Sequence, residues 1–251
     1  YYDNYANQLT KIIVSNLQQL YDGLEPCTIS IGKTDVRIGM NRRGVRAGKV
    51  VFEPNPSGIS IYDTPILKIS LNSSRKTIIW VNHGCHPTGM GADTRISADY
   101  PGVMKKVLLR DGTADGVMFF QGAAGTCKAV KKHQQELSFS NCMSDVGKNG
   151  QQLAAAVKAA LGKPLLPVEG QFACVTIEIE LPLKTNASRE SNAFVSEIQM
   201  IFLGDQLKLV SFPMEPAAEI AEKVLGLKGM SSGDFLLGYT NGLSGYLPSD
   251  Q

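Results

Sequence analysis

Cysteine and net charge are both scarce in this 251-residue chain, and each scarcity excludes some classes of protein. The five cysteines are odd in number, irregularly spaced and free of any CxxC pair, which predicts buried free thiols rather than a disulfide framework. One bridge is the most that this spacing leaves open. A formal net charge of +2, with no block of Lys or Arg, excludes the electrostatic footprint of a nucleic-acid-binding protein and a polybasic anchor. No apolar run is long enough to cross a bilayer.

What is present is an ordinary globular composition, with 43% hydrophobic and 19% charged residues. A chain of this length can bury a substantial core, either as one large domain or as two small ones. The sequence contains no internal repeat and no low-complexity linker, and it carries no signal for an oligomeric state.

The spacing of apolar residues predicts an alternation of helices and strands. A helix over 5–20 is expected because Leu9, Ile12, Ile13, Leu17 and Leu20 fall on one helical face, and Gly23 ends it. The other expected helices start at Pro101 or cover 145–161 and 216–225, and the expected strands cover 27–38, 66–71, 77–81, 117–120, 172–183, 197–203, 206–212 and 234–239. This order predicts an α/β fold, a layered domain with a mixed β-sheet flanked by helices.

Two stretches give weaker patterns. The Gly and Pro density of 41–63 predicts an ordered loop, and the short basic run over 128–132 is typical of a solvated helix start or loop.

Four polar loops follow apolar strands directly, at 81–88, 121–125, 213–216 and 238–248. Active sites of α/β sheets lie beyond the carboxyl ends of strands, so these loops converge if their strands are neighbours. His86 and Glu215 then meet as an imidazole and a carboxylate, a pair common in catalytic zinc sites. The alternative is that His86 is a hydrogen-bonding loop residue and that Glu215 simply begins a helix.

Several segments also carry a family resemblance. They are Asn-Arg-Arg at 41–43, Asn-Pro at 55–56, Asp63, the strand end at 80–88, Ile-Ser-Ala-Asp-Tyr-Pro-Gly at 96–102, Gln-Gly-Ala-Ala-Gly at 121–125, Phe-Pro-Met-Glu-Pro at 212–216 and the segment 238–248. In this order they resemble the neutral, non-lysosomal ceramidase family, most of all its microbial branch with His-Pro-Thr and Gly-Ala-Ala-Gly. The resemblance spans most of the chain and implies one catalytic domain over 1–251.

Carried over residue by residue, the resemblance places His86, Glu215 and Tyr246 on three of the four zinc-ligand positions of the family. Arg42 falls on an arginine that sits beside the lipid amide or product carboxylate, where a guanidinium can hold an oxyanion in bidentate fashion. The implied cofactor is Zn²⁺, which polarises an amide carbonyl and acidifies water.

The same resemblance assigns supporting roles. Gly122 and Gly125 of the glycine loop and Asn241 of the last segment fall where the substrate binds, and Asp99 falls next to the metal ligands. His83 lies three residues before His86 and is an extra feature outside the family pattern. His83 is not itself a family ligand. A loop or supporting role is its expected one.

The pattern departs from the family in three places. The fourth ligand belongs to a Thr-His-Thr-His type motif that precedes the helix over 5–20, and a Tyr-Glu motif follows Pro248; the given sequence contains neither, so we expect it to lack an N-terminal part and a C-terminal end of the domain. Lys128 stands where ceramidases carry a Ser proposed as nucleophile. Lys128 can offer charge to an oxyanion or form a surface salt bridge, and Cys127 can act as a nucleophile or remain a buried thiol.

The sequence therefore predicts a ceramidase-like zinc-dependent hydrolase that cuts an N-acyl amide, ceramide or a related lipid amide, with metal-activated water. Two alternatives stay open: a truncated family member without catalysis that acts as a binding or structural piece, and a hydrolase of another amide or ester, or of a phosphoester, on the same scaffold. The expected partner is a small-molecule or lipid amide substrate. Because microbial relatives are mostly exported, the resemblance implies a secreted or periplasmic protein.

Overall fold

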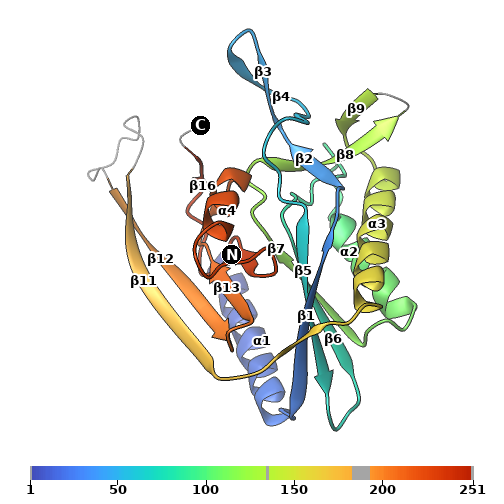
Figure 1. The fold of residues 1–251 in the computed structure, drawn as a ribbon, viewed down its shortest axis with the longest axis vertical. Coiled ribbons are helices and arrows are strands. Elements are labelled where there is room, and N and C mark those ends of the chain that lie inside the picture. The colour runs from blue at the N-terminus through green and yellow to red at the C-terminus, as the bar shows by residue number, and fades with distance from the viewer. Residues whose placement is uncertain (1, 134–135, 183–192, 250–251) are drawn as a thin grey trace.

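The computed structural model describes residues 2–133, 136–182 and 193–249 and is built around a five-stranded sheet (Figure 1). The strand order is β10-β1-β5-β6-β7, in which β6 and β7 run parallel and the other neighbours antiparallel. The strands are β10 (Leu166–Val168), β1 (Cys27–Asp35), β5 (Asp63–Leu71), β6 (Thr77–His83) and β7 (Gly116–Gln121). The expected strands over 66–71, 77–81 and 117–120 all lie in this sheet.

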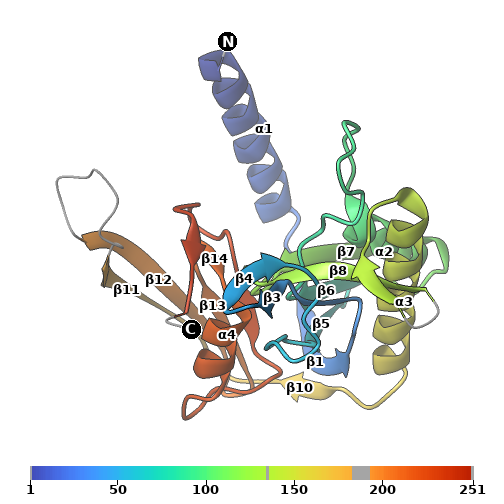
Figure 2. The same cartoon turned by 90° about the horizontal axis from the view of Figure 1, so that it is seen from above.

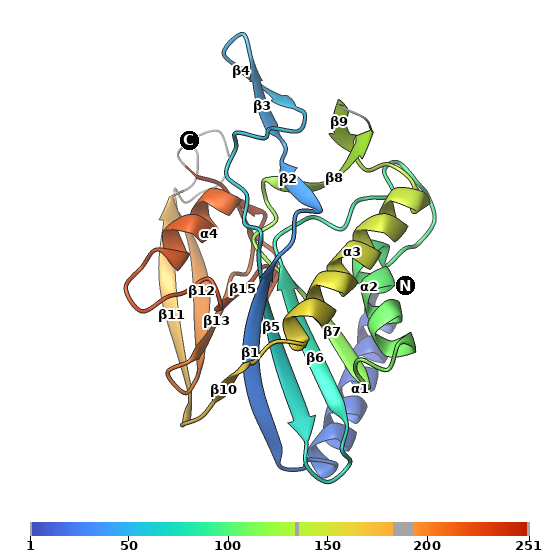
Figure 3. The same cartoon turned by 45° about the vertical axis from the view of Figure 1, so that its right-hand side comes forward.

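Two helices, α2 (Asp99–Arg110) and α3 (Met143–Leu161), cover one face of this sheet (Figure 3). Ile79 and Val81 point from β6 into this layer, where they pack with Met104 of α2 and Leu153 of α3. The period-2 pattern of the strand and the helical spacing of the two helices therefore meet in one core. Gly162 ends α3, as its position after the alanine-rich segment predicts.

A second sheet, of order β11-β12-β13-β15, lies on the other side of the first. Its strands are β11 (Phe172–Pro182), β12 (Ala193–Leu203), β13 (Leu207–Ser211) and β15 (Phe235–Leu237). One set of alternate side chains, including Leu209 and Phe235, packs against Leu67 of β5. The opposite set, including Val210 and Leu236, packs against α4 (Ala218–Leu225). The mixed α/β class is confirmed, with the sheet content divided between these two sheets.

Three small ribbons complete the structure. They are β2 (Gly39–Asn41) with β8 (Cys127–His133) and β9 (Glu136–Phe139), β3 (Arg43–Arg46) with β4 (Lys49–Phe52), and β14 (Glu215–Pro216) with β16 (Tyr246–Leu247). The interpretation of 41–63 as a loop was thus incomplete, because it contains the β3–β4 hairpin. The interpretation of 128–132 as a helix start or loop was wrong. Pairing of Met40 with Lys128, which no local pattern reveals, makes this stretch a strand.

Helix α1 (Tyr2–Asp22) stands away from the rest of the molecule (Figure 2). The expected helix over 5–20 is present, but its apolar side chains are exposed, with Leu17 at 60% and Ile12 at 58%. Two of the alternating apolar residues of β11, Val175 and Ile177, are likewise about half exposed. None of the helices in the described part of the chain is long and apolar enough to cross a membrane.

All five cysteines are free, as expected, but only two of them are buried. Cys85 and Cys127 lie in the core, whereas Cys27, Cys142 and Cys174 are exposed.

Candidate active site

The four strand-end loops converge, because β6 and β7 are parallel neighbours and so are β13 and β15. The carboxyl ends of such strands meet at the same edge of a sheet. Backbone hydrogen bonds then join the loops: Gly122 N donates to His83 O at 2.9 Å, Gly125 N to Pro216 O at 2.9 Å, and Gly238 N to Gln121 O at 2.9 Å. Residues far apart in the sequence are thereby held around one point.

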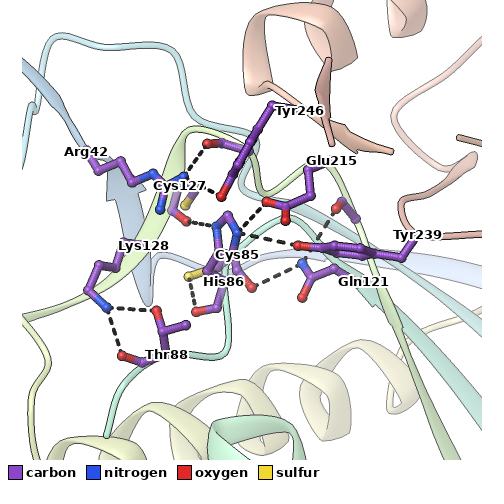
Figure 4. Close-up of polar contacts among 12 residues, drawn as sticks. Arg42, Cys85, His86, Thr88, Gln121, Cys127, Lys128, Glu215, Tyr239 and Tyr246 are labelled. Carbon is purple, nitrogen blue, oxygen red and sulfur yellow. Dashed lines mark hydrogen bonds and ion pairs between the residues drawn. The ribbon is translucent and has the colours of Figure 1, made fainter. Parts of the chain in front are cut away.

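His86 and Glu215 meet at that point, with 2.9 Å between His86 Nε2 and Glu215 Oε2 (Figure 4). The other ring nitrogen, Nδ1, lies 3.0 Å from the carbonyl oxygen of Cys127. A carbonyl can only accept, so Nδ1 must carry a hydrogen. In a neutral imidazole, Nε2 then presents a lone pair to a carboxylate oxygen. A proton, carried by either group, or a metal ion must therefore lie between them.

Local sequence explains the position of Glu215. Pro213 and Pro216 flank the segment, and the residue before a proline favours an extended backbone. The extended residue pairs in parallel with Tyr246 of β16, and Glu215 N donates to Gly245 O at 2.8 Å. The carboxylate is therefore anchored to the last polar loop.

Two tyrosines of that last loop flank the pair. The hydroxyl of Tyr239 lies 3.4 Å from His86 Nε2 and also faces Glu215. Burial, followed by the nearby Glu215 carboxylate, raises the pKa of Tyr239 well above its usual value. The Tyr239 backbone has a φ of 58°, an uncommon conformation that here aims the ring at His86. The sequence reading assigned the ligand position to Tyr246 and missed Tyr239, although both lie in the loop that it singled out.

Tyr246 meets the site through Arg42. The Arg42 guanidinium donates from Nη2 to Gly125 O at 2.8 Å and to the Tyr246 hydroxyl at 3.3 Å, and its carbon lies 5.7 Å from the Tyr246 ring centre. These contacts hold Arg42 at the rim of the site with further N–H groups available (Figure 4). Both tyrosine side chains are exposed, Tyr246 at 55% and Tyr239 at 36%.

Gly122 and Gly125 bring the loops into contact. A Cβ at Gly122 would lie 3.0 Å from backbone atoms of His83 and Gly84. A Cβ at Gly125 would lie 2.9–3.0 Å from backbone atoms of Glu215, Pro216 and Ala217. The absent side chains therefore allow the His86 and Glu215 loops to approach, in addition to any role toward substrate.

The remaining predicted residues lie around this centre. The ammonium of Lys128 donates to the carbonyl and hydroxyl oxygens of Thr88, and burial lowers its pKa. The Cys127 thiol is buried beside Cys85, and the carbonyl of Cys127 is the group that contacts His86. The side chain of Asn241 donates to Gln199 Oε1 at 3.4 Å.

His83 and Asp99 are buried next to the strand-end loops. His83 is 2% exposed, and its Nδ1 lies 2.9 Å from Thr64 Oγ1, while no described residue offers its Nε2 a hydrogen bond. Burial lowers the pKa of His83 to about 4. The Asp99 carboxylate accepts from the backbone N–H groups of Met90 and Tyr100, which fixes the turn into α2.

An open cavity of about 440 Å³ lies beside Tyr239 and Pro87, although neither His86 nor Glu215 lines it. Tyr239 and Gln121 line it on the His86 side, and Phe119, Pro87 and Pro101 give it apolar walls. The Gln121 amide donates to the carbonyls of His83 and Cys85 at 3.1 Å, so the lining is itself tied to the His86 loop. A partly apolar cavity with a few fixed polar groups is the usual form of a small-molecule site.

The donor set suits a zinc ion only in part. Within the described residues, no three His, Cys, Asp or Glu side chains gather as a metal-binding group. One imidazole nitrogen, one carboxyl oxygen and the Tyr239 phenol do face one another. These are nitrogen and oxygen donors of the kind that Zn²⁺ accepts.

The fold is that of the neutral ceramidases. The chain superposes on the crystal structure of neutral ceramidase from Pseudomonas aeruginosa with a TM-score of 0.68, 15% identity and coverage of 90% of this chain and 47% of that one. A structure described as ceramidase complexed with C2 gives a TM-score of 0.65, 16% identity and coverage of 89% and 48%. This chain thus spans about half the length of these structures. No family model matches the sequence, and the search of curated proteins found no relative.

Proposed function

We propose that this chain is the core of a zinc-dependent hydrolase that cleaves an N-acyl amide, with ceramide or a related lipid amide as the substrate class and the exterior of the cell or the periplasm as its location. The observation that supports the metal most directly is the 2.9 Å contact between His86 Nε2 and Glu215 Oε2. Because Nδ1 of the same ring is committed to the Cys127 carbonyl, Nε2 directs its lone pair at Glu215, and a zinc ion can take the place of the proton that the two groups otherwise share.

His86, Glu215 and Tyr239 would hold the metal. The Cys127 carbonyl orients the His86 ring and keeps Nε2 directed at the centre. A zinc ion held there supplies Lewis-acid activation of an acyl carbonyl and of the attacking water.

The chain's own residues supply binding and orientation. Arg42 lies beside Tyr246 with spare N–H donors, and a guanidinium in this place stabilises a developing oxyanion or a product carboxylate. The cavity lined by Phe119, Gln121 and Tyr239 opens next to His86 and accommodates part of a substrate larger than the reacting group. An amide with an apolar substituent fits this combination of charge and apolar wall.

A second candidate is a metal-binding piece without catalysis. It is favoured by the small donor set, since the described residues offer one imidazole and one carboxylate and the remaining donors are phenols. A catalytic zinc in most enzymes has three protein ligands. The two candidates share the metal and differ in turnover.

Metal content separates the proposal from a site without metal. We expect about one zinc per chain in the zinc-loaded protein after gel filtration, and a loss of that zinc in His86→Ala and in Glu215→Gln. Glu222→Gln on the exposed side of α4 is the matched control and keeps the metal. A folded wild-type chain without zinc contradicts the proposal.

Turnover separates the two candidates. The zinc-loaded chain is assayed with an N-acyl amide, the matching acyl ester and a phosphate ester. Amide cleavage that disappears in His86→Ala and after chelation supports the hydrolase, and stoichiometric zinc without turnover supports the non-catalytic piece. Ester or phosphate cleavage alone moves the reaction class to another hydrolase.

A further inference from the structure

The hairpin of β3 and β4 projects from the end of the molecule at which the candidate site lies (Figures 1 and 3). Its turn is made by Ala47 and Gly48, both in the left-handed region with φ of 50° and 73°. Two residues of this kind form the tight turn whose twist matches two antiparallel strands. The tip is therefore a defined structure that presents its side chains in fixed directions.

One face of the hairpin carries three exposed apolar side chains. Val45 pairs directly with Val50, and Arg43 pairs with Phe52, so all four side chains lie on the same face. Val45 is 67% exposed, Val50 68% and Phe52 64%. Adjacent exposed apolar side chains on a projecting element mark a contact surface rather than scattered surface residues.

The charges on the hairpin are almost all positive. Arg46 and Lys49 stand directly opposite each other beside the turn, an arrangement that costs folding free energy. Arg46 is compensated by Glu53. Among the described residues, no carboxylate lies within ion-pair distance of Arg43 or Lys49. A negatively charged partner is the counterpart that this arrangement lacks.

The hairpin is joined to the candidate site by Phe52. The Phe52 ring lies 4.9 Å from that of Phe139 on β9, and the Arg42 guanidinium lies 5.8 Å from its centre. Arg42 in turn donates to Tyr246 at the site rim. Whatever the hairpin contacts is thereby brought close to the opening of the site.

We propose that the β3–β4 hairpin is a docking surface for a lipid bilayer with anionic headgroups. A protein partner of ordinary affinity needs roughly 800 Å² on each side, far more than a two-residue turn and two valines provide. A bilayer needs only projecting apolar side chains that enter the acyl region and cations that reach the headgroups. Val45 and Val50 supply the apolar side chains, Arg43 supplies a cation on their face, and Lys49 supplies one on the opposite face beside the turn. The assignment rests on exposure and charge. It agrees with the proposed function but does not depend on turnover.

Vesicle flotation of the full chain tests this surface. We expect binding to phosphatidylcholine vesicles with about 30% phosphatidylserine, weaker binding to pure phosphatidylcholine, and a decrease with salt. Val45→Ser with Val50→Ser should lower the partition coefficient at least about ten-fold. Arg43→Gln with Lys49→Gln should lower it roughly five-fold per cation on the anionic vesicles only.

Matched controls use exposed residues of the same kinds elsewhere. Lys105→Gln with Lys106→Gln on α2 and Val175→Ser with Ile177→Ser on β11 should leave partitioning unchanged. Zinc content, measured on the same samples, should be the same in the hairpin variants as in the wild type. Loss of vesicle binding with zinc retained thus concerns the hairpin, whereas loss of zinc or turnover concerns the proposed function.

Three results overturn the proposal. They are wild-type chain that stays in the vesicle-free fraction, hairpin variants that float as well as the wild type, and binding that is abolished by Leu9→Ser with Ile12→Ser on α1 instead. Concentration-dependent dimerisation that the hairpin variants abolish, in the absence of vesicle binding, assigns the surface to a second copy of the chain and also overturns it.

Discussion

The strand-end loops around His86 bury their key side chains, whereas helix α1 leaves its apolar side chains exposed. Around His86, three backbone hydrogen bonds of 2.9 Å join four loops, and the His86 and Glu215 side chains are only 9% and 15% exposed. Helix α1 stands away from the body (Figure 2), and its apolar side chains, which have the usual helical spacing, are exposed. Periodicity thus reports that an element is amphipathic, but a partner in space decides whether its apolar face contributes to stability.

The largest expected effect comes from comparing a buried leucine of the core with an exposed leucine of α1. Leu153→Ala on α3, at a fully buried position, should lower the free energy of unfolding by about 2–5 kcal/mol, because it leaves a cavity in the core. Leu17→Ala on α1, at a 60% exposed position, should change it by less than about 0.5 kcal/mol. Urea denaturation measures both. Equal losses in the two variants contradict the contrast between these regions.

The second expected effect is a loss of stability in mild acid caused by His83. Burial lowers its folded-state pKa from the usual 6.5 to about 4, so the unfolded chain takes up the proton first as the pH falls. Stability is therefore retained above about pH 6.5 and decreases by up to about 3 kcal/mol between there and about pH 4. The free energy of unfolding, measured by denaturation at several pH values across this range, should depend less on pH in His83→Gln than in the wild type. A wild type and variant with the same pH slope rule His83 out.

A third effect, somewhat smaller, concerns the contact between the loops. Gly125→Ala places a methyl group 2.9–3.0 Å from backbone atoms next to Glu215, so we expect a loss of roughly 1–3 kcal/mol. Gly147→Ala in the second turn of α3 has open space around it and should instead stabilise the protein by about 0.5–1 kcal/mol. Thermal denaturation compares them. A neutral Gly125→Ala shows that the loops do not need their close approach.

The smallest effect separates the two tyrosines. Because the Tyr239 hydroxyl faces His86 and Glu215, Tyr239→Phe should weaken zinc binding about ten-fold. Tyr246→Phe removes a contact with Arg42 only and should change the affinity by less than about three-fold. Titration calorimetry with zinc measures both constants. The reverse order supports the sequence-based assignment of Tyr246 as the ligand.

Much of the fold was predictable because its strongest signals are local. The strands over 66–71 and 77–81 and the alanine-rich α3 follow from periodicity and from end residues such as Gly162. The ribbons β2–β8 and β3–β4 were missed because partners distant in sequence or turn geometry define them, and their residues alternate too weakly. The exposure of α1 and β11 was equally invisible, since a sequence pattern does not name its partner.

The candidate site was predictable as a set of loops but not atom by atom. Four loops after apolar strands were expected to converge, and they do, with His86 and Glu215 in contact. Which tyrosine faces His86 depends on the positive φ of Tyr239, and the role of Cys127 lies in its carbonyl. Neither feature leaves a trace in side-chain chemistry. Lys128 drew attention by its position in a motif, while its ammonium contacts Thr88.

X-ray absorption at the zinc edge of the zinc-loaded chain tests the central claim most directly. We expect one imidazole nitrogen and several oxygens at about 2.0–2.2 Å from the zinc, with the nitrogen signal lost in His86→Ala. Sulfur at about 2.3 Å, which the nearby Cys85 and Cys127 can provide, or a shell of solvent oxygens alone contradicts a metal centre at the His86–Glu215 pair.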